Sequence, residues 1–132
     1  MEPAILPKLV LLADNDLDFL DSFAELLDGT RRYRVLKARS PDEARSIIEF
    51  YPDLAAVLLD IRLTNDSDVR DTSGLDVAEC IPGSIPYLFL SASCRNETRK
   101  LVWDKTKKVI QSKTADPRLR VDAVDALFNL VA

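Results

Sequence analysis

The chain has 132 residues, of which 47% are hydrophobic and 30% charged, and its formal net charge is -4. This length and composition are typical of a soluble globular protein, so we expect one domain over residues 1–132. The acidic balance argues against a nucleic-acid partner, because phosphate binding depends largely on a basic surface. No apolar run has the length of a membrane span and the N-terminus lacks the features of a signal peptide, which predicts a cytoplasmic protein without a membrane partner.

The residue inventory excludes several kinds of catalytic site. The sequence contains no histidine and only two cysteines, Cys80 and Cys94. Without histidine, neither a serine–histidine–aspartate triad nor a metal site built on imidazole can form. The two cysteines are too few for a disulfide framework and do not form a CxxC pair, which fits a reducing compartment.

Five apolar segments alternate with five segments of helical pattern. The expected strands are residues 8–13, 33–38, 56–60, 86–90 and 109–112. The expected helices are residues 16–27, 41–51, 74–81, 95–108 and 117–131. Strands that alternate with helices form a parallel sheet covered on both faces. We therefore predict an α/β fold with a doubly wound, five-stranded parallel sheet and five helices.

Local signals support the first two helices. The first has apolar residues at helical spacing, which predicts that these residues face the core: Leu20, Phe23, Ala24 and Leu27. Gly29 follows, and we expect it just past the helix end. Ser40 and Glu43 form a capping box at the start of the second helix, and we expect Tyr51 on the inner face at its end.

Polar side chains follow four of the expected strands: Asp14, Asp60, Ser91 and Lys113. Parallel strands end at one edge of the sheet, where ligands bind, so we expect these four side chains to gather there. Two neighbouring carboxylates repel unless a cation lies between them. Oxygen ligands without histidine or thiolate favour Mg²⁺. With the ammonium of Lys113 and the hydroxyl of Ser91, the set suits phosphoryl transfer to a carboxylate.

These four positions resemble the motifs of the receiver domain of bacterial two-component response regulators. Asp14-Asn15-Asp16 is similar to the acidic motif of the first strand in that family, and Leu58-Leu59-Asp60 is similar to its phosphoacceptor. Leu90-Ser91-Ala92 resembles its hydroxyl-bearing turn, and Ser112-Lys113 its lysine motif. The resemblance covers roughly residues 8–131, which is nearly the whole chain.

The resemblance implies both a fold and a function. The implied fold is flavodoxin-like, with strand order 2-1-3-4-5. Asp60 would accept a phosphoryl group from a phosphohistidine of a sensor histidine kinase or phosphotransfer protein, and Lys113 and Ser91 would contact that group. The implied Mg²⁺ ligands are Asp14, Asp60, the backbone carbonyl of Arg62, and Asn15 either directly or through water. The implied protein is a stand-alone signalling switch with a separate downstream protein target, and the resemblance leaves a homodimer open.

Several residues depart from the family pattern. Asn15 stands where a second acid is most common, which removes one negative charge from the metal site. Thr114 replaces the proline that usually follows the lysine, and Ile110 replaces the aromatic residue of the signalling switch. The loop over residues 64–73 is longer than usual, and the helix after it is correspondingly short.

Two positions bear on the lifetime of the phosphoryl group. In the family, the residues two beyond the phosphoacceptor and two beyond the hydroxyl residue flank the attacking water. Here these residues are Arg62 and Ser93. An arginine near the phosphoryl group shields it from water and pairs with its oxygens, which predicts slow self-dephosphorylation.

Other readings of the same residues are weaker. A calcium loop over residues 65–72 fails because Arg70 and Asp71 stand where an EF-hand needs a ligand and then glycine, so we expect a solvated acidic loop. A flavodoxin would need a phosphate loop after the first strand, where Asp14 and Asp16 would repel phosphate. A haloacid-dehalogenase-type phosphatase would use Asp14 as nucleophile, but it needs a longer chain. The main alternative is a degenerate receiver that binds partners without phosphorylation.

Overall fold

The computed structural model describes residues 6–65, 67–92, 95–113 and 116–129. Five parallel strands form one sheet in the order β2-β1-β3-β4-β5, which confirms the predicted fold and strand order. The strands are β1 (Lys8–Ala13), β2 (Tyr33–Ala38), β3 (Ala56–Asp60), β4 (Tyr87–Ser91) and β5 (Ile110–Ser112). All five residues of β3 are buried, as expected for a central strand that is covered on both faces.

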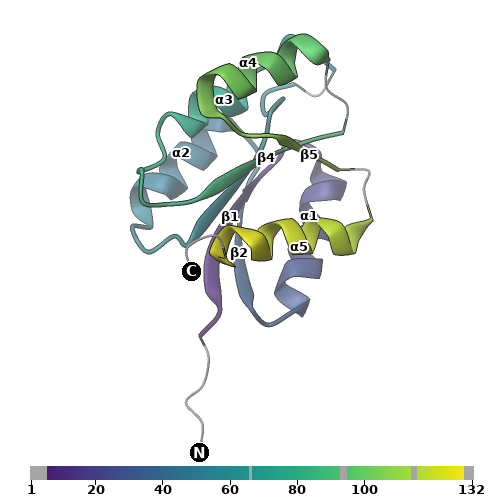
Figure 1. Ribbon diagram of the computed structural model, residues 1–132. Helices are drawn as coiled ribbons and strands as arrows, with labels where there is room; N and C mark the ends of the chain where they lie inside the picture. The colour runs from purple at the N-terminus through teal and green to yellow at the C-terminus, as the bar shows by residue number, and fades with distance from the viewer. Residues whose placement is uncertain (1–5, 66, 93–94, 114–115, 130–132) are drawn as a thin grey trace, which may run out of the picture.

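Helices cover both faces of the sheet (Figure 1). They are α1 (Leu17–Gly29), α2 (Pro41–Phe50), α3 (Ser73–Ala78), α4 (Asn96–Thr106) and α5 (Pro117–Asn129). Residues of α2, α3 and α4 share one core cluster with one face of the sheet, and residues of α1 and α5 share a second cluster with the other face. The fold is therefore a three-layer α/β/α arrangement.

Successive apolar side chains of β1 point alternately into the two core clusters on opposite faces of the sheet. In β1, Val10 and Leu12 belong to the cluster under α1 and α5, whereas Leu11 and Ala13 belong to the cluster under α2, α3 and α4. This follows from the two-residue period of a strand, which directs successive side chains to opposite faces. Each large apolar side chain that is fully buried contributes about 1.5–3 kcal/mol, so this pattern anchors the strand whose end carries Asp14.

The ends of α1 and α2 differ from two expectations. Gly29 is the last residue of α1 rather than the residue beyond it, and the left-handed residue after the helix is Arg31, with φ of 63°. The cap is Thr30, whose hydroxyl donates to the carbonyl of Leu27 at 2.7 Å, so glycine is not needed there. Tyr51 caps α2 and is 40% exposed, because the helix ends at Phe50 before Tyr51 can turn inward.

Helix α4 is weakly buried. Its buried residues are Thr98 and Val102, whereas Leu101 is 37% and Trp103 49% exposed. Few buried contacts are typical of an element with low local stability. None of the helices in the described ranges has the length and hydropathy needed to cross a membrane.

Candidate functional site

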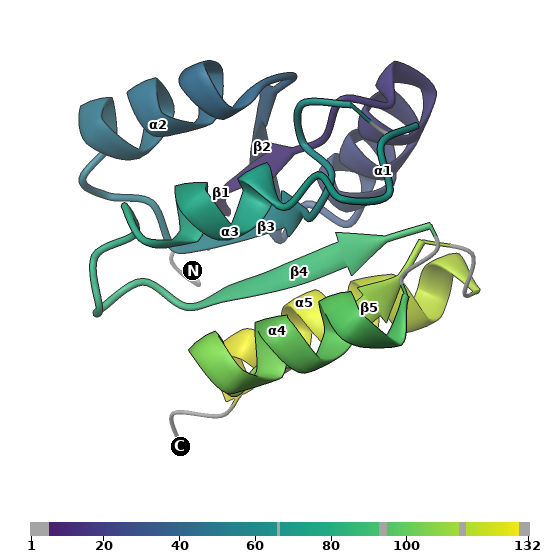
Figure 2. The same cartoon turned by 90° about the horizontal axis from the view of Figure 1, so that it is seen from above.

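The predicted site residues lie at the carboxyl ends of the strands. Asp14 directly follows β1, Asp60 ends β3, Ser91 ends β4 and Lys113 directly follows β5. The backbone N–H of Lys113 donates to the carbonyl of Ser91 at 3.0 Å, which holds the two strand ends together. In Figure 2 the arrowhead of β4 and the loop after β3 lie toward the same side of the molecule.

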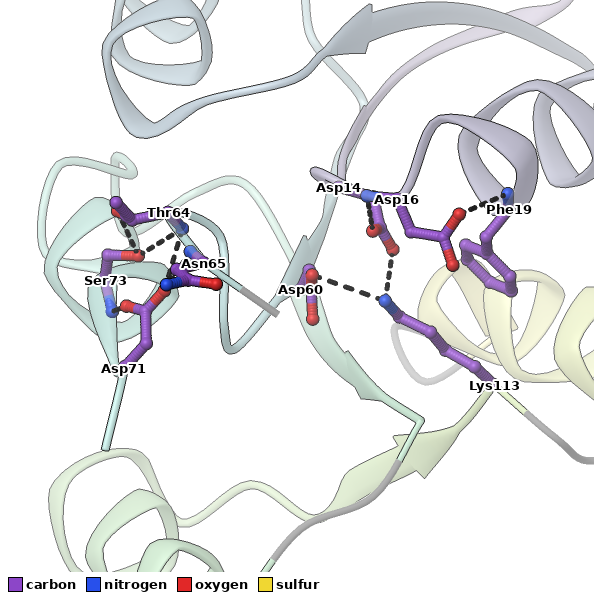
Figure 3. Close-up of polar contacts among 9 residues, drawn as sticks. All are labelled: Asp14, Asp16, Phe19, Asp60, Thr64, Asn65, Asp71, Ser73 and Lys113. Atoms are coloured by element: carbon purple, nitrogen blue, oxygen red, sulfur yellow. Dashed lines mark hydrogen bonds and ion pairs between the residues drawn. The ribbon is translucent and has the colours of Figure 1, made fainter. Parts of the chain in front are cut away.

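A buried ion network occupies this edge (Figure 3). The Lys113 ammonium lies 2.7 Å from Asp14 Oδ2 and 3.3 Å from Asp60 Oδ2. Asp14 is 0%, Asp60 2% and Lys113 9% exposed. Two carboxylates in so little water would repel strongly, and the ammonium compensates this repulsion. The structure thus brings Asp14, Asp60 and Lys113 into direct contact.

Burial raises the pKa of Asp14 above its ordinary value, because removal from water disfavours the charged carboxylate. The charge of Lys113 and hydrogen bonds from Lys113 and from the backbone N–H of Asp16 oppose this effect without cancelling it. The Asp16 bond is 2.9 Å long. Asp14 is therefore a carboxylate that a further cation would stabilise in its charged form.

Oxygen donors beside this network suit a divalent metal that keeps part of its ligand shell as water. Asn15 Oδ1 is buried and makes no hydrogen bond within the described part of the chain. One carboxylate oxygen of Asp16 is already used, because Oδ1 caps α1 by accepting from the N–H of Phe19 at 3.2 Å. In the described ranges, no three acid, cysteine or histidine side chains come together as a metal-binding group. Two carboxylates and an amide oxygen fit Mg²⁺ chemistry, since this ion usually keeps several waters.

The remaining predicted residues lie at or near this edge of the sheet or outside the described residues. Ser91 is 7% exposed at the end of β4, and Arg62 is half-buried two residues beyond Asp60. Ile110 is 7% exposed and packs in the core cluster of α2, α3 and α4. Ser93, which we expected to flank an attacking water, and Thr114, which replaces the family proline, lie outside the described residues.

The long loop after β3 is organised around one of its own acids rather than being merely solvated. Asp71 accepts hydrogen bonds from the backbone N–H groups of Thr64 at 2.9 Å, Asn65 at 2.7 Å and Ser73 at 2.9 Å. Burial by itself would raise the pKa of Asp71, but these hydrogen bonds outweigh burial and lower the pKa below its ordinary value. In Figure 3 this cluster lies apart from Asp14 and Lys113.

Gly74 fixes the end of that loop against the site. A Cβ at this position would lie 2.0 Å from the backbone oxygen of Asp60, closer than any real contact allows. The N–H of Gly74 donates to the carbonyl of Ile61 at 3.0 Å. The first turn of α3 therefore packs directly on the backbone that carries Asp60, and only glycine leaves room for it.

Two residues absent from the sequence predictions contact Lys113. The Lys113 ammonium lies 5.0 Å from the centre of the Phe19 ring, and Arg120 Nη1 donates to the carbonyl of Lys113 at 2.6 Å. One signal pointed to Arg120: it lies four residues before Val124, on the apolar face of α5, where a charge is unexpected. Phe19 had no distinguishing signal among the apolar residues of α1.

Solved structures with a similar fold include response regulator receiver domains. One from Methanospirillum hungatei matches with a TM-score of 0.76 at 20% identity, over 93% of this chain and 95% of that one. A receiver protein from Sinorhizobium medicae matches with a TM-score of 0.74 at 22% identity, over 96% and 98% of the two chains. A response regulator from Burkholderia pseudomallei, solved with a phosphorylated aspartic acid, a calcium ion and citrate, matches with a TM-score of 0.66 at 23% identity, over 92% and 75%.

No family model and no curated protein matches the sequence. At these identities the structural similarity establishes the fold. The chain therefore has the receiver-domain fold, and its chemistry has to be argued from its own residues.

Proposed function

We propose that this chain is a signalling receiver whose Asp60 accepts a phosphoryl group. The observation that supports this proposal best is the Lys113 ammonium held between the buried carboxylates of Asp14 and Asp60 at the ligand-binding edge of the sheet. A buried ionic cluster is costly to maintain and often less stable than an apolar core of the same volume. Its presence at this edge is better explained by chemistry than by stability.

The proposed reaction is nucleophilic attack by a carboxylate oxygen of Asp60 on the phosphorus of a phosphohistidine. The P–N bond breaks, its electron pair stays on the imidazole nitrogen of the donor, and an acyl phosphate forms on Asp60. Lys113 would move its hydrogen bond from the carboxylate to a phosphoryl oxygen, and the hydroxyl of Ser91 would donate to another. The donor would be a sensor histidine kinase or a phosphotransfer protein in the cytoplasm, and a further protein would read the phosphorylated state.

A divalent metal would act beside these residues. Asp14, Asp60, Asn15 and the backbone carbonyl of Arg62 would hold Mg²⁺, which would neutralise charge on the transferring phosphoryl group. Arg62 would also shield the acyl phosphate from water, so the Arg62→Ala variant should lose its phosphoryl group faster than the wild type.

Incubation with acetyl phosphate and Mg²⁺, followed by intact mass spectrometry, tests the proposal. We expect one phosphoryl adduct on the wild type and none on Asp60→Asn, which preserves the shape of the side chain. Asp76→Asn is the matched control, because Asp76 is an exposed acid on α3, and this variant should take up the adduct normally. An adduct that persists in Asp60→Asn would show that another residue is the acceptor.

One observation favours a second function, a receiver-like module that binds partners without phosphorylation. Lys113 already compensates both carboxylates, and the acidic ligands at this edge are two among the described residues. Such a network already has one cation between its two carboxylates without a metal. Absence of any adduct with acetyl phosphate, phosphoramidate and a phosphorylated kinase would support this alternative, as would absence of beryllofluoride binding.

A further inference from the structure

Helices α1 and α5 hold Lys113 at the two ends of the residue. From α1, the ring of Phe19 lies 5.0 Å from the ammonium. From α5, Arg120 donates to the backbone carbonyl at 2.6 Å. The guanidinium of Arg120 also lies 5.2 Å from the centres of the Phe19 and Phe23 rings. Both cations therefore contact the ring of Phe19, and the three residues form one packed unit beside the carboxylates.

The lysine needs such support because its side chain is long and flexible. Four rotatable bonds separate its backbone from an ammonium that contacts Asp14 and Asp60 at the same time. An aromatic face attracts a cation, more strongly when water is excluded, and Lys113 is only 9% exposed. The bond from Arg120 fixes the backbone from which the side chain starts.

Arg120 is also poorly placed for a purely electrostatic role on the surface. Burial lowers its pKa, which means that its guanidinium has lost hydration. Its neighbour Arg118 shows the contrast, because that side chain is 89% exposed and forms an ion pair with Asp116 on the same turn. The partial burial of Arg120 is compensated by its hydrogen bond to Lys113 and by two aromatic faces.

We propose that Phe19 and Arg120 are positioning residues for Lys113, which hold its ammonium against Asp60 in the geometry that phosphoryl transfer requires. The proposal rests on the function proposed above and adds two residues that act through the lysine. Small losses of alignment slow reactions strongly. We expect Phe19→Leu and Arg120→Met each to slow phosphorylation by acetyl phosphate by about tenfold.

Comparison of phosphorylation rates and unfolding temperatures across control variants distinguishes a role in positioning Lys113 from a role in core packing. Phe19→Tyr keeps an aromatic face and should retain the wild-type rate within about twofold. Phe23→Leu removes a fully buried ring, one that packs on Arg120, and should lower the unfolding temperature more than the rate. Arg118→Met removes an exposed arginine from the same helix and should leave the rate unchanged. A rate that follows unfolding temperature across all variants, rather than contact with Lys113, would overturn the proposal.

A second measurement does not depend on phosphorylation. Nitrogen-edited NMR detects a lysine ammonium only when burial and hydrogen bonds slow its proton exchange with water, and Lys113→Met identifies the signal of this residue by its loss. We expect the Lys113 signal in the wild type, Phe19→Tyr and Arg118→Met, and its loss or broadening in Phe19→Leu and Arg120→Met. An unchanged signal in both of the last two variants would refute positioning. If the wild type takes up no phosphoryl group, the proposed function fails, while the NMR result still decides whether these residues hold the lysine.

Discussion

Replacing Lys113 by methionine should destabilise the protein in a strongly pH-dependent way. Methionine keeps much of the length and volume of the side chain but removes the ammonium that lies 2.7 Å from Asp14 and 3.3 Å from Asp60. Two carboxylates that are 0% and 2% exposed then remain without their shared cation. We expect the free energy of unfolding at neutral pH to fall by about 3–5 kcal/mol, the usual cost of removing one partner from a buried ion pair.

The two distances from the Lys113 ammonium to the carboxylates set an upper limit on this loss of unfolding free energy. With an effective dielectric constant of about 20, the attraction to Asp14 at 2.7 Å is about 6 kcal/mol, and that to Asp60 at 3.3 Å is about 5 kcal/mol. Two effects reduce the net loss below these gross values. The variant no longer has to bury an ammonium, and one carboxylate can take up a proton instead of remaining charged.

That proton uptake sets the direction of the pH dependence. Burial already raises the pKa of Asp14, and Lys113 opposes the rise, so removing the lysine raises this pKa further. A carboxyl group whose pKa is higher in the folded state stabilises the fold below its unfolded pKa of about 3.9. This contribution is lost as the pH rises through the folded pKa. The Lys113→Met variant should therefore be least destabilised at acidic pH and increasingly destabilised as the pH rises through the folded pKa of Asp14.

Urea denaturation of the wild type and the variant at several pH values tests this reasoning. Lys37→Met is a matched control, because the Lys37 ammonium lies 2.9 Å from Asp21 but its side chain is 47% exposed. An exposed pair contributes about 0–1 kcal/mol, so this variant should lose little at any pH. If Lys113→Met does not fold at neutral pH, the double variant with Asp14→Asn should recover most of the stability. A loss that is independent of pH, or as small as that of Lys37→Met, would refute the argument.

Three further predictions concern other features of the same edge. Asn15→Asp adds a carboxylate and should tighten Mg²⁺ binding by somewhat less than tenfold, about 1 kcal/mol, as measured by calorimetric titration; equal affinities would argue against metal at this edge. Gly74→Ala should lower the free energy of unfolding by about 1–3 kcal/mol because its methyl group would overlap the backbone of Asp60, whereas Gly29→Ala, with no atom within 4 Å of the added carbon, should raise it by about 0.5–1 kcal/mol. Asp71→Ala should reduce the hydrogen-exchange protection of the three loop amides that donate to Asp71. In the wild type this protection should persist at pH values above the ordinary carboxyl pKa and disappear as the pH falls through the lowered pKa of Asp71. If neither the substitution nor the pH change affected the loop, Asp71 would not organise it.

The strands and the edge of the sheet could be predicted from sequence because their signals are local. The burial of β3 follows from an unbroken apolar run, and the position of Asp60 follows from its place at the end of that run. The inner face of α1 follows from helical periodicity, which depends only on residues three and four apart. Parallel connectivity then brings residues such as Lys113 to the same edge although more than half of the chain separates it from Asp14.

The contacts that shape the site could not be predicted, because they join residues through space. Phe19 contacts Lys113, far away in sequence, and nothing near Phe19 in the chain indicates this partner. Gly74 is required by the backbone of Asp60, which only the register of the folded chain brings to it. The predicted end of α1 was wrong for a related reason. The hydroxyl of Thr30 donates to the carbonyl of Leu27 and caps the helix, a role that glycine more often fills, and the sequence has no unique signal for this alternative cap.

Charge links the proposed metal to the proposed phosphorylation. When Asp14 and Asp60 are ionised, Lys113 leaves the cluster with one net negative charge. Phosphorylation would replace the single charge of Asp60 by between one and two negative charges. A divalent ion would then gain attraction, so Mg²⁺ binding and phosphorylation should strengthen each other by equal free energies. The neutral Asn15 weakens metal binding before phosphorylation but also removes a charge that would repel the incoming phosphoryl group. The site should therefore depend on phosphorylation for tight metal binding more than a site with a third carboxylate would.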